Sequence, residues 1–595
     1  MKKKTTLLCA AMALGLFNAH ADMVHKKFSM LDSPEQSTIQ TLKSSGDYIY
    51  TFANFGTSAT AGTSATFLSQ TFTGVAYTNG NSYGKNLLVV KHDADGNVSW
   101  TMNSNKGDID ASGSGFIPTA DGGVFMALDT RYTGGNEFND DVIFQAVNSD
   151  ESTTTVTFDC SFWTHQPLFV KVDNQGDVEW TKLAYCDTTA RPNADYYNYG
   201  TPDAFDIYDV AVDDDGNYYV VGRIKADFTI DSITIPSHNN ATWDGDSQES
   251  CGNAFILKLN SDGNYVSHLV TSGSAEYDQL KTATVHNGKL YVAGHYKGDG
   301  SNSIGLGGQT LTVGSETGMW VACLDLNLTV SWATAIPGAT VNNKNSIQME
   351  TMNFNTTGDR FYLGGGVQGG IVINNTKTIS SKSSMYNSFV VEVNANNGSV
   401  LNGVVAQNNS IGKVYGIVAN SDSIYVYGYD WGRSSGGQVY LDSYDLNLNP
   451  IHQYALLNNS NMPTAWGCAV DGDKMVVAFR GRNQFTFPGS EETYNKSYFQ
   501  GGLLFLEFPG YDFDESATGP GTGLVNTNSS EVHVYSQFGK LLIAGAEGQD
   551  VSIFNATGVC VAHFTATSST ESISLPQGFY VVRAGTICKK ALVQK

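Results

Sequence analysis

Apolar and polar positions alternate in short runs along this chain, and the clearest example lies between Asp206 and Val270. Two apolar runs of strand length flank the turn Asp-Asp-Gly-Asn at 214–217, and two more flank Ser-Asp-Gly-Asn at 261–264. Asp-Gly between β-rich runs is a strong hairpin signal, because both residues tolerate positive φ. The stretch therefore predicts two hairpins, which together make a unit of four antiparallel strands.

This unit recurs, which predicts an all-β chain without a long amphipathic helix. Repeated four-stranded units are typical of a β-propeller, and we expect about seven blades. A first turn before a strand that ends near Gly occurs at Gly46, Gly122, Gly216, Gly288, Gly358, Asp422 and Gly472. Second turns follow at 95–97, 175–177, 262–264, 327–328, 397–398 and 447–448.

The spacing of the units is irregular, because polar segments are inserted between the strands. The glycines at positions 46, 122, 216, 288 and 358 are 76, 94, 72 and 70 residues apart, whereas ordinary propeller repeats are about 40–50 residues long. The longest insertions, at 57–71, 136–157 and 237–251, are rich in Ser, Thr, Gly and Asn. We expect them to be loops that carry a binding face.

The seventh unit lacks its last strand. The run GLLFLEF at 502–508 matches a third strand, but no second hairpin follows it. Residues 24–30, VHKKFSM, resemble the fourth strands of other units, and we predict that they complete the last blade. This pairing would remove two open sheet edges. Three tryptophans that follow second turns, Trp100, Trp180 and Trp332, are predicted to pack between blades.

The two ends of the chain carry further segments. Residues 1–21 have a basic start, an apolar core and Ala19-His20-Ala21, as in a signal peptide cleaved before Asp22. No later run reaches the roughly 18 apolar residues of a spanning helix. The propeller is predicted to occupy residues 22–509, followed by a Gly/Pro-containing linker at 510–530. Seven short strand-like runs at 531–595 predict a small immunoglobulin-like β-sandwich.

The charge of the chain excludes some classes of partner. The formal net charge is −23, and removing residues 1–21 takes away three lysines, leaving 31 basic against 57 acidic residues, or −26. Such acidity argues against nucleic acid and anionic membranes as partners. Among eight cysteines, the pairs Cys160–Cys186 and Cys560–Cys588 could form bridges, while Cys323 and Cys468 lie in apolar strands and are expected to be buried thiols.

Residues 531–595 resemble the C-terminal sorting domain of type IX secretion. The resemblance rests on the strand and turn that end at Gly558, on Leu575-Pro576-Gln577-Gly578-Phe579-Tyr580, and on the basic-then-apolar end that begins with Lys589 and Lys590. Val559 stands where the family usually has Lys or Arg, and Asn555 where it usually has Asp. The resemblance implies export, passage across the outer membrane with the type IX machinery as partner, and removal of this domain at the surface.

The repeat region resembles bacterial propellers of the SBBP and PQQ-like type in architecture. The Trp of a sialidase Asp-box lies three residues after Gly, whereas Trp100 lies four after Gly96, which argues against a sialidase. Asp93 to Asn97 starts like a calcium loop, but position 12 would be Ser104. Asp213 to Asp215 are expected to form a hairpin turn rather than a calcium site.

The function is open between two main classes. Asp203, Asp206 and Asp209 could line one propeller face, but no catalytic, cofactor or metal constellation can be assigned from sequence. We therefore expect an exported, surface or extracellular propeller that binds a protein or glycan. The alternative is a secreted glycosidase or lyase acting on polysaccharide, and a third class is a structural protein without a small ligand.

Overall fold

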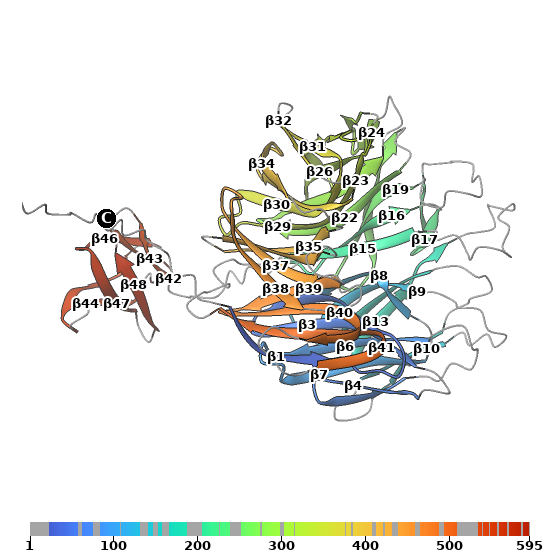
Figure 1. Ribbon diagram of the computed structural model, residues 1–595, viewed down its shortest axis with the longest axis horizontal. Coiled ribbons are helices and arrows are strands. Elements are labelled where there is room, and N and C mark those ends of the chain that lie inside the picture. Colours follow the sequence, from blue (N-terminus) through green and yellow to red (C-terminus); the bar gives the residue numbers. More distant parts are fainter. Residues whose placement is uncertain are drawn as a thin grey trace, which may run out of the picture. The chain divides into compact units, whose positions relative to one another are not determined.

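The computed structural model describes residues 23–508 and 533–593 with short gaps, and every regular element in these residues is a β-strand (Figure 1). The chain divides into two compact units, residues 1–524 and 525–595. The predicted signal peptide and the linker at 510–530 lie outside the described residues. The gaps are 58–61, 75–83, 107–108, 131–140, 147–152, 158–165, 187–204, 225–226, 238–251, 274–276, 298–302, 315, 375–376, 382–384, 407–411, 421–422, 431–437, 458–463, 487–492, 538–539, 545, 547, 556–557, 568–569 and 585–586.

The first unit is built from large antiparallel sheets that follow one another along the chain. Each begins with an inner strand, and Asp-Gly and similar turns join its hairpins as predicted. From the inner strand outward, the sheets contain β2 (Ser37–Ser45), β3 (Tyr48–Thr57), β6 (Gly84–His92), β7 (Val98–Lys106), β10 (Asp141–Ala146) and β11 (Thr153–Thr157); β8 (Ile109–Pro118), β9 (Val124–Thr130), β12 (Gln166–Val172) and β13 (Val178–Leu183); β15 (Phe205–Val212), β16 (Tyr218–Ile224), β19 (Asn253–Leu259) and β20 (Tyr265–Val270); β22 (Tyr277–His286), β23 (Lys289–Lys297), β26 (Gly318–Asp325) and β27 (Val330–Ile336); β29 (Ser346–Phe354), β30 (Arg360–Gln368), β33 (Asn387–Asn394) and β34 (Val400–Val405); β35 (Gly412–Ala419), β36 (Ser423–Asp430), β37 (Gln438–Asp445) and β38 (Pro450–Leu457); and β39 (Thr464–Asp471), β40 (Lys474–Thr486), β41 (Thr493–Glu507) and β1 (Val24–Met30).

The inner strands of these sheets form a closed ring of contacts. β2 contacts β8, and each inner strand then contacts the next one through β15, β22, β29 and β35 to β39. β39 contacts β2, so the ring returns to its first member. Sheets that radiate from such a ring are arranged as in a β-propeller.

The N-terminal strand completes the last sheet, as predicted. β1 pairs antiparallel with β41 from Val24 opposite Glu507 to Met30 opposite Gly502. Lys26 adds an ion pair to Glu507 at 2.5 Å, and Phe28 packs against the apolar core of this sheet. The first and last strands of the unit are therefore joined by backbone hydrogen bonds.

The insertions contain more strand than predicted. The segment 136–157 was expected to be a loop, but it contains β10 and β11, which extend the first sheet to six strands. The β-branched run Thr153–Thr157 explains why a polar segment can pair as a strand. Other insertions form small sheets: β4 (Ser64–Phe67) with β5 (Gln70–Thr73); β14 (Tyr185–Cys186) with β17 (Phe228–Ile230) and β18 (Ile233–Ile235); β21 (Ser272–Gly273) with β24 (Ser303–Leu306) and β25 (Gln309–Thr312); and β28 (Gly338–Ala339) with β31 (Gly370–Ile373) and β32 (Lys377–Ser380).

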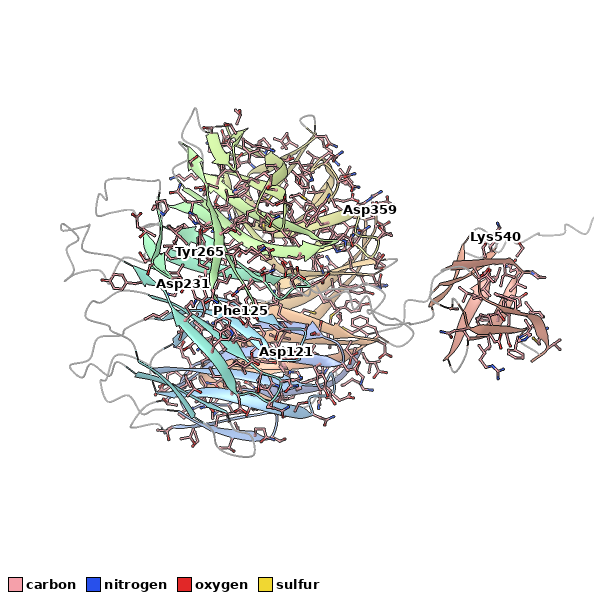
Figure 2. The ribbon with its side chains drawn as sticks, turned by 180° about the vertical axis from the view of Figure 1, so that it is seen from behind. Asp121, Phe125, Asp231, Tyr265, Asp359 and Lys540 are labelled. Atoms are coloured by element: carbon pink, nitrogen blue, oxygen red, sulfur yellow. The ribbon has the colours of Figure 1, made fainter. Side chains whose placement is uncertain are left out.

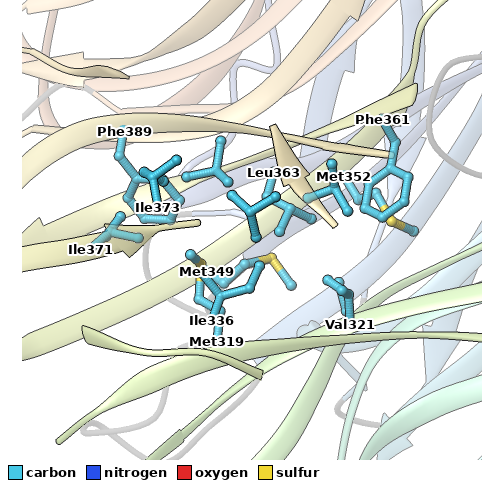
Figure 3. Packing of buried hydrophobic residues seen from close by; sticks show 14 of the residues in the cluster. Met319, Val321, Ile336, Met349, Met352, Phe361, Leu363, Ile371, Ile373 and Phe389 are labelled. Carbon is cyan, nitrogen blue, oxygen red and sulfur yellow. The ribbon is translucent and has the colours of Figure 1, made fainter. Parts of the chain in front are cut away.

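The core lies between neighbouring sheets. Met319 and Val321 of one sheet meet Met349, Leu363 and other apolar residues of the next (Figure 3). Phe125, labelled in Figure 2, lies in another of these interfaces. Its ring stacks on that of Tyr218 in the following sheet, with ring centroids 3.9 Å apart. Close contact between sheets fixes each one against its neighbours.

The three tryptophans pack between sheets, which confirms their predicted role. Trp100 is 2% exposed and belongs to a core cluster that includes residues of the next sheet. A Cβ atom at Gly263 or Gly398, glycines of the following second turns, would lie 2.5 Å from Trp180 or Trp332, and a Cβ atom at Gly176 would lie 3.1 Å from Trp100. Each of these turns therefore needs glycine both for its positive φ and for the indole beside it.

The second unit contains two sheets with a shared core. One joins β42 (His533–Gln537), β43 (Lys540–Ala544) and β46 (Thr570–Ser574); the other joins β45 (Cys560–Thr565), β44 (Asp550–Asn555), β47 (Gly578–Ala584) and β48 (Ile587–Val593). All seven predicted strand runs are strands. Leu541 and Ile543 of the first sheet share a buried cluster with Ile553 and Val582 of the second.

The proposed bridge between Cys560 and Cys588 is wrong. Cys560 lies on β45 and Cys588 on β48, the two edges of one sheet, with β44 and β47 between them. Three strand spacings separate the two residues by about 14 Å, whereas bridged Cα atoms lie about 4–7 Å apart. Cys560 is a free, exposed thiol, and Cys323 and Cys468 are free and buried, as predicted. Cys160 lies outside the described residues.

Candidate functional site

Six inner strands carry a β-bulge at the same level of the ring. In each of them one residue has no partner on the second strand, and this extra residue is half-buried. A bulge redirects a side chain and is frequent beside functional sites. The extra residues are Gln40, Tyr208, Lys281, Glu350, Tyr415 and Trp466.

These six side chains line one cavity of about 220 Å³. The seventh inner strand, β8, has its own irregularity between Asp110 and Gly115, and contributes Phe116 to the cavity wall. Because every inner strand supplies a residue to the wall, the cavity lies within the ring that these strands form. The repeated bulge is therefore what places polar and aromatic side chains around one space.

Glycine opposite the bulge makes this geometry possible in four of the sheets. Gly222, Gly294, Gly365 and Gly428 each pair with the residue just before the bulge. A Cβ atom at these positions would lie 1.8–2.0 Å from a backbone carbonyl oxygen of the inner strand. This contact explains why the second strands end near Gly in the sequence.

We expect Gly294→Ala to lower the free energy of unfolding by roughly 2–4 kcal/mol, because the Gln279 carbonyl oxygen would lie 1.8 Å from the new Cβ. Gly314→Ala is the matched control, since nothing lies within 4 Å of its Cβ position. Urea unfolding of both variants measures the difference. Equal stability of the two variants would contradict the clash.

The two carboxylates that line the cavity, Asp209 and Glu350, are both held in ion pairs. The Asp209 carboxylate forms an ion pair with Lys43 Nζ at 3.2 Å. It also accepts hydrogen bonds from the Thr282 hydroxyl at 2.9 Å and the Ala283 amide at 3.2 Å. Asp209 thereby links its own strand, β15, to the inner strands β2 and β22. Glu350 pairs with Lys413 at 3.4 Å.

Lys281 differs from the other cations of this region. Its ammonium lies 3.6 Å from the centroid of the Tyr208 ring, and among the described residues it makes no ion pair. Burial lowers the pKa of Lys281, while Glu350 and Asp206 act in the opposite direction. A half-buried cation held over an aromatic ring remains available to an anionic ligand.

Aromatic side chains form the other part of the wall. Tyr415 and Trp466 lie with ring centroids 5.0 Å apart at an interplanar angle of 44°. Burial, followed by the charge of Glu350, raises the pKa of Tyr415, so its hydroxyl stays protonated. The cavity thus combines a cation, hydroxyl and amide groups, and aromatic faces, which suits binding of a small polar ring.

The sequence pointed to part of this site. Asp206 forms an ion pair with Arg223, Asp209 lines the cavity, and Asp203 lies outside the described residues. The bulge residues were missed, although their signal is present: Ile207-Tyr208-Asp209-Val210 and five similar stretches place apolar residues three apart, which breaks the two-residue alternation of a strand.

The candidate calcium loops are hairpin turns. The Asp213 carboxylate accepts the Asn217 amide at 2.8 Å and the Tyr219 hydroxyl at 2.8 Å. Asp93 likewise accepts the backbone amides of Asp95 and Asn97. In the described part of the chain, no group of three His, Cys, Asp or Glu side chains could hold a metal ion. These carboxylates therefore stabilise turns.

A domain of unknown function, DUF6383, matches residues 522–593. None of the curated proteins matches the chain. The DUF6383 segment overlaps the second compact unit, residues 525–595.

Solved structures similar to this chain include several propellers. The Dos1 propeller is 9% identical, with 82% of this chain and 95% of that chain covered and a TM-score of 0.32. PorZ, a surface component of the type-IX secretion system of Porphyromonas gingivalis, is 10% identical, with 95% of this chain and 100% of that chain covered and a TM-score of 0.24. The Neurospora crassa Pan2 WD40 domain is 11% identical, with 65% of this chain and 86% of that chain covered and a TM-score of 0.28. Scores below 0.5 do not establish a shared fold or function.

The motif residues of the DUF6383 segment have structural roles. The Tyr580 hydroxyl donates to the Pro576 carbonyl at 2.8 Å, which closes the corner after Leu575. Gly558 has φ of 81° in the turn between β44 and β45. The backbones of Lys589 and Lys590 pair with Val582 and Val581 on β47, while the predicted cleavage residues Ala19 and Ala21 lie outside the described residues.

One buried carboxyl group makes stability depend on pH. Burial raises the pKa of Asp278, on the same strand as Lys281, to about 7, and the Thr271 hydroxyl donates to it. An unfolded Asp has a pKa near 3.9. From about pH 4 to 7 the folded chain keeps a proton that the unfolded chain has lost, so stability falls as pH rises, by a total on the order of 4 kcal/mol.

We expect Asp278→Asn to raise the thermal unfolding midpoint above pH 7, because the amide cannot ionise. The gain should shrink as the pH falls toward 4, where Asp278 is protonated in both states. The exposed Asp262→Asn is the control, with an effect independent of pH. A gain for Asp278→Asn that is the same at pH 5 and pH 8 would contradict the buried-acid explanation.

Proposed function

We propose that this chain is an exported propeller of seven blades that binds a glycan or protein outside the cell. The observation that carries the proposal is the cavity of six bulge residues, because a repeated distortion that converges on one space serves binding better than packing. No helix in the described residues is long and apolar enough to span a membrane.

The C-terminal unit would direct the export of the chain to the cell surface or the medium. Its Leu575-Pro576-x-Gly578-x-Tyr580 motif, closed by the Tyr580 hydrogen bond, supports a role as a type IX sorting domain with an immunoglobulin-like sandwich. The hydrogen bond from a Tyr hydroxyl back to the chain a few residues upstream is a feature of such sandwiches. The type IX machinery is then the partner of this unit, and the proposed site of action is the cell surface or the medium.

The second candidate is an enzyme that cleaves polysaccharide. It is favoured by one observation, namely that Asp209 and Glu350 both line the cavity. Both carboxylates are held in ion pairs, and Asp209 accepts three further donors including its neighbour Val210. Such carboxylates suit a structural role better than the transfer of protons, so binding without turnover is the preferred function.

The test is a glycan array together with a polysaccharide-degradation screen, both on residues 22–595. Binding without product supports the proposal. Product formation that Asp206→Asn or Glu350→Gln abolishes would favour the enzyme instead. A chain that neither binds nor cleaves in either screen would contradict both candidates.

The insertions at 57–71, 136–157 and 237–251 remain proposed as additional contacts for a large ligand. Much of 237–251 lies outside the described residues. Their polar composition suits adaptable hydrogen bonding to a glycan or protein surface.

A further inference from the structure

We propose that the cavity binds a hexuronic acid residue, with its carboxylate on Lys281 and its ring against Tyr415 and Trp466. This inference rests on the proposed function, and it names the chemistry of the ligand. Three features of the cavity carry it: an excess positive charge, an aromatic face, and a set of polar groups suited to sugar hydroxyls.

The charges around the cavity leave one cation over. Lys43 pairs with Asp209, Arg223 with Asp206, and Lys413 with Glu350. Lys281 is the fourth cation beside three carboxylates, so these groups sum to one positive charge.

The surroundings of Lys281 keep this charge local. His295 lies near Lys281, Arg223 and Lys413, and burial followed by these cations holds the pKa of His295 well below its usual range. The imidazole is therefore neutral and adds no charge. One positive site in a strongly acidic chain selects a ligand with a single negative group, because a second would meet Glu350 or Asp209.

The aromatic side of the cavity suits a sugar ring. Tyr415 and Trp466 come from neighbouring inner strands, and both are half-buried with part of their surface open. An aromatic ring offers a broad apolar face to the C–H groups of a sugar while leaving its hydroxyls at the edge. The Lys281 ammonium lies over the ring of Tyr208, so a third aromatic side chain borders the cation in the cavity wall.

Polar groups distinguish a sugar from an aromatic acid. Gln40, Thr41, Glu350 and Thr351 also line the cavity. An aromatic carboxylate would displace water from these groups without replacing its hydrogen bonds, which costs affinity. A polyol can donate to Glu350 and exchange hydrogen bonds with the amide and hydroxyl groups.

The size of the cavity fits one sugar residue. Its volume of about 220 Å³ is smaller than the roughly 300–1,000 Å³ of sites for drug-sized ligands. The cavity therefore takes a monosaccharide or the terminal residue of an acidic polysaccharide, rather than several residues of a chain.

The test uses the mature chain, residues 22–595, and calorimetric titration with galacturonate and glucuronate. Galactose and glucose lack the carboxylate and show how much it contributes. Benzoate has a carboxylate but no hydroxyl groups, and inorganic phosphate shows whether any small anion binds. We expect uronate to bind at least 10-fold tighter than any of these probes, and added salt to weaken it.

Two variants at the cavity should act in opposite directions. Lys281→Met keeps the length of the side chain and should weaken uronate binding about 10–100-fold, as for loss of a charge-assisted hydrogen bond. Glu350→Gln removes a like charge and should strengthen uronate binding several-fold without strengthening galactose binding. Lys289→Met, on the exposed start of β23, is the matched control and should change neither.

Several outcomes would overturn the inference. These are equal affinity of Lys281→Met and the unaltered chain at equal thermal stability, weaker uronate binding by Glu350→Gln, and binding of galactose, benzoate or phosphate as tight as uronate. A chain that binds glycans on the array but no uronate would overturn this inference and leave the proposed function standing. Failure of both screens would remove the proposed function as well.

Discussion

Truncation after Ser530 is expected to leave the propeller in the periplasm of a cell that has type IX secretion. The truncated chain lacks the whole described second unit, including the Gly578–Tyr580 segment and the strand with Lys589 and Lys590. The first unit has its own core clusters and its own closing strand, so it should fold without the second. Fractionation and immunoblotting of periplasm, surface and medium measure the result, and we expect loss of nearly all exported material.

Two further chains make this experiment specific. Residues 525–595 fused behind a periplasmic reporter should carry the reporter to the surface or medium, which tests sufficiency. Tyr580→Phe keeps the ring but removes the hydrogen bond to Pro576, and should destabilise the unit by about 1 kcal/mol. If the chain that ends at Ser530 still reached the surface in normal amounts, the sorting proposal would fail.

Deletion of residues 24–30 is expected to destabilise the first unit by at least about 4 kcal/mol, since several backbone hydrogen bonds at roughly 0.5–1.5 kcal/mol each are lost. The deletion also removes Phe28 and Met30 from the core and exposes the edge of β41. An open, apolar edge promotes pairing between chains. The thermal midpoint should therefore fall, and the variant should aggregate on heating.

Two controls separate the strand from its side chains. Replacing residues 24–30 by Gly and Ser at the same length should be as harmful as deletion, because the strand and not the chain length matters. Lys26→Met removes only the exposed ion pair with Glu507 and should cost less than about 1 kcal/mol. An unchanged midpoint in the deleted chain would show that β1 does not close the last sheet.

Local signals made most of the strands predictable from sequence. Asp-Gly and Asn-Gly turns fix a hairpin within a few residues, so the four-stranded units and the seven strands of the second unit were found. The pairing of β1 with β41 was found because the last unit lacked a strand and VHKKFSM had the right pattern. The strand β11 was missed because its Thr-rich segment has no distinct alternation, and β10 was missed because its apolar run, Val142 to Phe144, is short and lies within a polar insertion.

The cavity could not be predicted, because its residues lie between positions 40 and 466 and meet only through the ring. In the sequence, each bulge by itself only interrupts the alternation of apolar and polar residues in one strand. Asp209 was noticed for its spacing to Asp206, but its ion pair is with Lys43 on a strand far away in sequence. Likewise, Cys560 and Cys588 looked suitable for a bridge until strand order placed them on opposite edges.

The pairing of β1 with β41 has a consequence for the order of events during synthesis. Val24 leaves the ribosome long before its partner Glu507, the last residue of β41. At about 5–20 residues per second, β1 waits roughly 25–100 seconds for its partner. The last sheet therefore cannot form until almost the whole propeller has been made. The first and last strands of the unit therefore stay unpaired for most of the time that the chain takes to be made.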